Sequence, residues 1–299
     1  MTLDSLQWGP IVSFPIEWIS LSLLVAGAIY WERAALSGIG IEGCLLASML
    51  GLCLGYEWTG DYGIAVAAGV GSALVFALAG STLLLSLRAD PIIGSFGLSL
   101  IPAVTLGLLT RLWPLRLLRE TPPPGLLTGT IFDGTYAEDL IASPMLVAAP
   151  LLLALAGWLL WHTPFGIRLR AFGENPGWRV PGSRPTAYRL SALALGALWT
   201  VPAAALLLRA HPTEPPLALG YLALACAIAG RWTVWGGILL AVGPALIRSA
   251  RPYGSEFLSG FVVLDVAPFL LALLYLVLLS RRSLRLAASP QARTDPDVL

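Results

Sequence analysis

Long apolar runs separated by short polar segments make up most of the chain. A helix needs about twenty consecutive, mainly apolar residues to cross a bilayer. Nine segments are candidates, at residues 10–30, 35–56, 62–87, 91–113, 140–161, 188–208, 216–230, 233–248 and 259–279. The seventh and eighth are short and lie close together, which predicts either two short helices in a tight bend or a pair that does not fully cross. The pattern predicts an all-α, polytopic membrane protein with about nine transmembrane helices, some of them short or broken.

Composition supports this fold class and removes one kind of partner. Hydrophobic residues make up 57% of the 299 residues and charged residues only 12%, whereas soluble domains carry about 25% charged residues. The net charge is +1, so no basic surface points to nucleic acid. We expect one transmembrane domain at residues 1–280, surrounded by membrane lipid, and a polar cytoplasmic tail at residues 281–299.

All eighteen basic residues are arginine, and their positions predict the orientation of the chain in the membrane. Cytoplasmic loops of membrane proteins carry an excess of basic residues. Twelve of the arginines fall inside if the 162–187 loop and the tail are cytoplasmic, which puts the N-terminus outside. Without lysine the chain has no phosphate loop of the G-x-x-x-x-G-K-[ST] type. If ATP drives this protein, another chain must hydrolyse the ATP.

A carboxylate inside the second apolar segment is the first candidate functional group. Glu42 lies in a run that includes Gly38, Gly40 and Gly43, and these glycines favour an interrupted helix. A charge at the bilayer centre costs about 2.5–3.5 kcal/mol, so such residues usually face a partner or a cavity. Glu42 either accepts hydrogen bonds from backbone donors freed by this break or, with Gly40 and Gly43, lines a solute pathway. On the first interpretation Glu42→Gln keeps much of the function that Glu42→Ala loses.

Small residues inside the apolar segments predict close helix packing, because helices in lipid approach one another at such residues. The positions are Gly51 and Gly55, Gly69 and Gly71, Ala223 and Ala227, and Gly236 and Gly237. Three cysteines, Cys44, Cys53 and Cys226, lie in apolar runs without metal-ligand or CxxC spacing. We interpret them as small apolar fillers between helices.

The 162–187 loop begins with a short amphipathic segment. Its apolar residues are Phe165, Ile167, Leu169 and Phe172, and its basic residues are Arg168 and Arg170. Gly173 and the Asn175-Pro176 pair are expected to end a helix there. Such an element fits a groove on another protein, with its apolar side chains as anchors. The alternative is an ordinary basic loop that lies on lipid headgroups.

The sequence contains no recognisable catalytic or metal-binding pattern. His162 and His211 stand far apart at the ends of apolar segments, and neither has a cysteine or a second histidine nearby. Most of the eleven tryptophans fall near expected membrane interfaces, which is typical of an aromatic belt. We therefore predict no enzymatic activity and no cofactor for this chain.

The run Thr163–Pro176, TPFGIRLRAFGENP, resembles the cytoplasmic loop of ABC importer permeases. It matches the pattern T-x-x-G-x-x-x-R-A-x-G-E-N-P of nucleoside-type (simple sugar/basic membrane protein) permeases. These permeases form one group with the branched-chain amino acid and ribose permeases. The run Glu32–Gly43 resembles the family's early S-E-R-A-G-x-x-N-x-G-x-E-G block, although Gly38 or Ile39 stands where the family usually has asparagine.

The resemblance implies the permease subunit of an ATP-driven importer in the bacterial plasma (inner) membrane, for nucleosides or a related small polar solute. It implies three partners: a cytoplasmic ABC ATPase, a second permease subunit in a heterodimeric pore, and an extracytoplasmic substrate-binding lipoprotein. It also implies an ATPase-coupling helix, with the residues Phe165, Arg168, Arg170, Phe172, Gly173, Glu174 and Asn175. After this motif the chain departs from the family, because residues 177–182 are rich in glycine and proline.

Two other functions stay open on the residues alone. A secondary transporter would need ion-coupling carboxylates in both halves of the chain, and Glu42 has no clear mate. A polytopic membrane enzyme acting on lipid would need paired aspartates or histidines at one membrane face, and the sequence shows no such pair. The solute itself, whether nucleoside, riboflavin, sugar or amino acid, also stays open.

Overall fold

Every regular element in the described part of the chain is helical. The structure is a computed structural model, and it describes residues 3–87, 89–112, 144–174, 185–211, 216–254 and 263–280. The helices are α1 (Leu3–Arg33), α2 (Ile41–Thr59), α3 (Tyr62–Ser81), α4 (Pro91–Leu112), α7 (Pro144–His162), α8 (Pro164–Glu174), α9 (Pro185–Ala210), α10 (Leu219–Ala229), α11 (Val234–Leu240), α12 (Val242–Gly254) and α13 (Val263–Ser280). A 3₁₀ turn precedes α2, and a π-helical turn follows α3. The predicted all-α fold is confirmed, whereas the expected tail at 281–299 lies outside the described residues.

Five helices among the described residues are long and apolar enough to cross a membrane. They are Ser13–Arg33, Gly38–Thr59, Tyr62–Leu84, Pro91–Leu112 and Thr186–Leu208. Two further pairs are bent at a short break, α7 with α8 by 65° and α10 with the following helices by 117°. Counting each pair as one span gives up to seven in the described residues, so the expected number of nine is not confirmed. Residues 216–230 and 233–248 form a single bent pair, and the last segment provides only a shorter apolar helix, Val266–Leu278.

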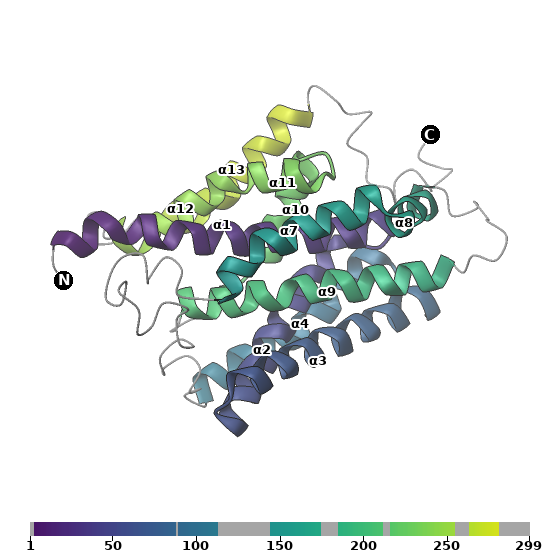
Figure 1. The fold of residues 1–299 in the computed structure, drawn as a ribbon, viewed down its shortest axis with the longest axis horizontal. Helices are drawn as coiled ribbons and strands as arrows, with labels where there is room; N and C mark the ends of the chain where they lie inside the picture. Colours follow the sequence, from purple (N-terminus) through teal and green to yellow (C-terminus); the bar gives the residue numbers. More distant parts are fainter. Residues whose placement is uncertain are drawn as a thin grey trace.

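The first two helices form the interior of the bundle. Of the five long spans, α2 and α1 are the most enclosed, whereas most of α3 and α4 is exposed. Figure 1 shows α1 running through the molecule, with the N-terminus at one end and α8 at the other. We call these the N-terminal end and the α8 end. Helix α1 contacts α7, α9, α10 and α12, while α2 contacts α3, α4 and α9. Apolar side chains such as Ile93, Ile101 and Val104 of α4 remain exposed, as a lipid-facing helix requires.

Prolines and polar caps explain where several helices begin. Proline is favoured at the first position of a helix, because the missing N–H has no intrahelical partner there and the ring fixes a helical φ. Four helices start in this way, at Pro91, Pro144, Pro164 and Pro185. Asp90 also accepts hydrogen bonds from the N–H groups of Ile92 and Ile93, both at 2.9 Å, and so caps α4.

Glycines allow α2 and α3 to pack closely. A Cβ added at Gly51 would lie 2.2 Å from Ser72 Oγ and 2.5 Å from the Ala68 carbonyl oxygen. At Gly55 it would lie 2.7 Å from the Ala68 Cβ. These residues of α2 confirm the predicted role of small residues, and the three cysteines are buried as expected. Gly71 of α3 differs, since a Cβ there would meet nothing within 4 Å.

These two environments predict opposite effects of adding one methyl group. Gly51→Ala is expected to push α2 from α3 and to lower the thermal stability of the purified protein. Gly71→Ala places its methyl group in open space, and alanine is favoured over glycine in a helix by about 0.8–1 kcal/mol, so its melting temperature should stay equal or rise. Thermal unfolding in detergent measures both variants. Equal melting temperatures for the two would contradict the close α2–α3 contact.

Candidate functional site

The short helix α8 begins at a local cap that the sequence encodes. Thr163 Oγ1 accepts a hydrogen bond from the Gly166 N–H at 3.2 Å and donates to the Leu159 carbonyl oxygen at 2.5 Å. Threonine is a favoured N-cap residue, and Pro164 follows it at the first helical position. The chain therefore leaves α7 and immediately starts a new helix, bent by 65° from the last.

Two glycines let α8 lie against the ends of other helices. A Cβ at Gly166 would lie 2.2 Å from the carbonyl oxygen of Leu160 in α7, and one at Gly173 would lie 2.1 Å from that of Arg33 in α1. Backbone atoms cannot retreat as a flexible side chain can, so both positions need glycine. The motif glycines thus fix α8 across the α8 end of the bundle.

The inner face of α8 is fully packed within the chain. Leu169 and Phe172 are 0% and 1% exposed. Tyr188 of α9 stacks on Phe165, with ring centroids 5.8 Å apart, and packs on Phe172 at 5.3 Å. The Tyr188 hydroxyl also accepts a hydrogen bond from Arg168 at 3.0 Å. This differs from the sequence expectation that Phe172 is presented to a partner, because Tyr188 already covers that face.

The outer face of α8 is the part that another molecule can reach. It consists of Pro164, Ile167, Arg168 and Ala171, of which the first three are exposed and the last is half-buried. Ile167 is 53% exposed and supplies the apolar centre. The predicted motif residue Asn175 lies outside the described residues, whereas Glu174 is exposed at the end of the helix.

Arg33 joins α8 to the break between α10 and α11. Its Nη1 forms an ion pair with Glu174 Oε1 at 3.2 Å, and its Nη2 donates to the Trp232 carbonyl oxygen at 3.1 Å. Trp232 lies in the sharp turn where the chain reverses by 117°, and both Arg231 and Trp232 adopt left-handed backbone angles there. Three segments far apart in the sequence therefore meet at one guanidinium.

Glu42 holds the start of α10. Its Oε1 accepts a hydrogen bond from the Ala218 N–H at 2.7 Å, and its Oε2 accepts one from the Gly220 N–H at 2.5 Å. Ala218 precedes α10 with a φ of 66° and offers no side-chain cap. The first N–H groups of a helix lack intrahelical acceptors and carry partial positive charge. The buried carboxylate of α2 therefore serves as the cap that α10 itself does not provide.

The break around Gly38 is held by a different carboxylate from the one expected. Residues Gly38–Gly40 form a 3₁₀ turn, which confirms an interruption at this point. Its freed donor, the Gly38 N–H, is bound by Glu32 Oε1 at 2.9 Å and not by Glu42. Gly40 and Gly43 approach side chains closely, since a Cβ would lie 2.2 Å from the Trp31 ring and 2.1 Å from the Phe76 ring.

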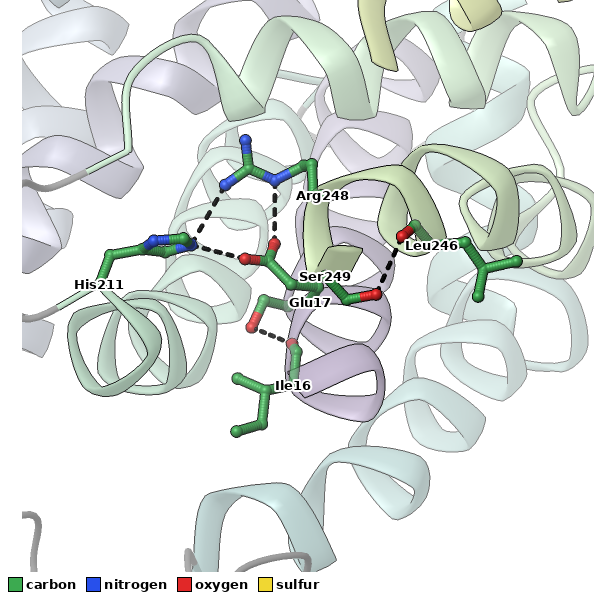
Figure 2. Close-up of polar contacts among 7 residues, drawn as sticks. Ile16, Glu17, His211, Leu246, Arg248 and Ser249 are labelled. Carbon is green, nitrogen blue, oxygen red and sulfur yellow. Dashed lines mark hydrogen bonds and ion pairs between the residues drawn. The ribbon is translucent and has the colours of Figure 1, made fainter. Parts of the chain in front are cut away.

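A buried polar cluster lies at the N-terminal end of the bundle. Figure 2 shows Glu17 of α1, His211 after α9 and Arg248 of α12 pointing toward one another. Glu17 Oε1 lies 2.5 Å from His211 Nε2, and Glu17 Oε2 accepts a hydrogen bond from Arg248 Nε at 2.9 Å. Glu17 and Arg248 are both buried. The cluster ties three helices together through one carboxylate.

Sequence reasoning did not find this cluster. Glu17 falls inside the first predicted span, and an ionisable residue in such a span requires a partner. That signal was available, but the partners are 194 and 231 residues away in the sequence. Glu42 was recognised from the sequence, but its bonding partners, which lie 176 and 178 residues away, were not.

These elements define the class of the protein. It is an all-α, polytopic membrane protein with a short helix across one end and a broken helix whose start is capped inside the bundle. No protein-family model matches the chain, and no solved structure matches it.

A curated bacterial protein is similar over most of its length. The chain is 25% identical, over an alignment of 289 residues, to the guanosine ABC transporter permease protein NupQ of Bacillus subtilis (strain 168). The alignment covers 86% of this chain and 87% of the relative. The similarity confirms the resemblance to nucleoside-type ABC permeases that the runs Thr163–Pro176 and Glu32–Gly43 indicate. It also favours a transporter over an enzyme.

Proposed function

We propose that the protein is the transmembrane permease subunit of an ATP-driven ABC importer for nucleosides. The similarity to a guanosine permease along most of both chains supports this function, and the apolar helices supply the spans that a permease needs. The membrane is the bacterial plasma membrane, with the α8 end in the cytoplasm. The partners are an ABC ATPase, a second permease subunit and an extracytoplasmic substrate-binding lipoprotein.

The outer face of α8 is the observation that carries the proposed coupling to an ATPase. An exposed isoleucine beside an arginine, on a helix set across one end of the bundle, can enter a groove on another protein with the aliphatic side chain as its anchor. The inner face is locked to Tyr188, and Gly173 seats the helix on α1. A movement of α8 would therefore also move the transmembrane helices α1 and α9, because α8 is packed directly against both.

We place the solute pathway at the start of α10, beside Gly40, Glu42 and Gly43. Helix α10 has 11 residues and is about 16 Å long at 1.5 Å per residue. Its C-terminal end lies at the α8 end, so its start lies inside the bundle. Broken helices whose N-termini end inside the membrane line substrate sites in transporters. Glu42 uses both oxygens on α10, so its role here is to hold that helix start.

Replacing Ile167 by aspartate tests the proposed coupling. The charge falls on the exposed face of α8, so the chain should fold and insert normally. We expect release of the ATPase on co-purification and loss of ATP-dependent uptake of labelled guanosine. Both are measured in cells that carry the complete transporter.

The matched control is Ile64→Asp, which alters an isoleucine of similar exposure, 50% against 53%, at the start of α3. Uptake and co-purification should survive this change. If both also survive Ile167→Asp, the ATPase docks elsewhere. If guanosine uptake continues without ATP hydrolysis but stops when ion gradients are collapsed, the protein is a secondary transporter.

A further inference from the structure

An aromatic groove lies at the α8 end, between the end of α7 and the start of α11. Its volume is about 470 Å³, within the usual range of about 300–1,000 Å³ for ligand pockets. Trp158, Trp161 and Trp235 provide its walls, and Ala154 lies at one end. Trp158 and Trp235 remain largely exposed. Neither the outer face of α8 nor the start of α10 contributes to this groove.

The groove changes from polar to apolar along its length. His162 and Thr233 line it where α7 ends and α11 begins, and Ala154 lines it eight residues earlier in α7. Eight residues of helix correspond to about 12 Å. Beyond Ala154, the exposed side chains in the preceding turn of α7 are Pro150 and Leu151, which are also apolar. A ligand that fills the groove is therefore polar at the membrane boundary and apolar toward the bilayer interior.

Positive charge without a matching carboxylate borders the polar end. The Arg170 guanidinium stacks on the Trp161 ring, with Cζ 4.1 Å from the centroid, and its Nε is buried without a hydrogen-bond partner. No carboxylate in the described residues forms an ion pair with Arg170, whereas Arg33, on the same ring at 5.5 Å, pairs with Glu174. Arg231 is also exposed, two residues before Thr233.

We propose that this groove binds an anionic glycerophospholipid, with the phosphate beside Arg170 and an acyl chain between Trp158 and Trp235. Tryptophan is enriched at headgroup level, and basic pockets between transmembrane helices bind anionic headgroups. A polar solute would leave the apolar part unfilled. An apolar helix of another protein would leave Arg170 buried without an anion. A lipid with one negatively charged headgroup places its phosphate beside Arg170 and its acyl chain in the apolar end of the groove.

Lipid binding to the full-length chain, purified in detergent without its partners, tests this proposal. Phosphatidylglycerol and zwitterionic phosphatidylcholine are added in turn, and retained lipid is counted by native mass spectrometry. We expect phosphatidylglycerol to bind about tenfold more tightly, and Arg170→Gln to remove this preference. Ala154→Leu fills the apolar end and should weaken both lipids. Because neither ATP nor solute is present, the result does not depend on the proposed transport function.

Two matched variants separate this groove from the general lipid surface. Arg111→Gln removes an exposed arginine at the end of α4, and Ala79→Leu enlarges an exposed alanine of α3. Both should bind lipid as the unaltered protein does. Equal binding of the two lipids, or equal loss in Arg111→Gln and Arg170→Gln, would overturn the proposal. So would a disulfide, formed with an added oxidant, between Trp235→Cys and a cysteine introduced into a second permease subunit of the assembled transporter, because the groove would then be a protein contact.

Discussion

Glu42→Ala is expected to abolish most nucleoside uptake and to lower the thermal stability of the protein. The change removes both acceptors of the N–H groups of Ala218 and Gly220 at the start of α10. Each buried donor left without a partner costs about 1–3 kcal/mol. Water cannot readily replace the carboxylate, because Glu42 is only 3% exposed. The left-handed conformation of Ala218, which is unfavourable by itself, then loses the hydrogen bond that holds it.

Glu42→Gln should give an intermediate result. A glutamine has one carbonyl oxygen, so it can accept one of the two bonds, and its NH₂ group then faces the other N–H. The sequence alone predicts that glutamine keeps much of the function. In the structure, glutamine can keep about one of the two hydrogen bonds, so we expect a smaller part of the function to remain. Melting temperature and uptake, measured together, check this order. The control is Glu57→Ala at the other end of α2, and a Glu42→Ala protein that behaves like it would contradict the capping role.

The second large effect is expected at the buried cluster of the N-terminal end. Glu17→Leu leaves Arg248 buried without its carboxylate, and breaking a buried ion pair on one side costs about 3–5 kcal/mol. We expect a strong fall in thermal stability, with α12 released from α1. His211 cannot replace the carboxylate, since its ring offers no negative charge.

A double variant distinguishes this loss of pairing from a simple packing defect. Glu17→Leu combined with Arg248→Met removes both charges and replaces them by apolar side chains, which is often tolerated in a protein interior. The double variant should be more stable than the Glu17→Leu protein. Thermal unfolding of the two single variants and the double variant gives the interaction energy. If the double variant loses as much stability as the two single losses added together, the two side chains are not coupled.

The sequence predicts the local features of this fold well. Helix starts depend on adjacent residues, as at Asp90 and Pro91 for α4 and at Thr163-Pro164 for α8, although the prediction of the spans did not use these signals. Gly51 and Gly55 mark the α2–α3 contact. In each case the signal lies within a few residues of the structure that it determines, so the pattern alone is sufficient.

Features that depend on distant segments could not be predicted in this way. The apolar side chains of α8 do not show which face turns inward, and Tyr188 from another helix decides it. Nor does the sequence show which tryptophans pack inside the bundle: Trp31 is buried and donates its indole N–H to the Leu193 carbonyl oxygen at 3.1 Å. The number of nine spans is not confirmed in the described residues, but the tight bend that the sequence allowed between residues 216–230 and 233–248 is found at Trp232, where the chain turns by 117°.

The position of Arg33 has a mechanical consequence. Because one side chain holds both Glu174 and the backbone of Trp232, we expect α8 and the C-terminal end of α10 to move together. Helix α10 has 11 residues, so it is short enough to move as a rigid body. A displacement of α8 by a few ångströms, about the size of helix shifts in other switching proteins, would reach Ala218 about 16 Å deeper without bending any long span. The movement would end at the start of α10, where Glu42 accepts hydrogen bonds from the N–H groups of Ala218 and Gly220.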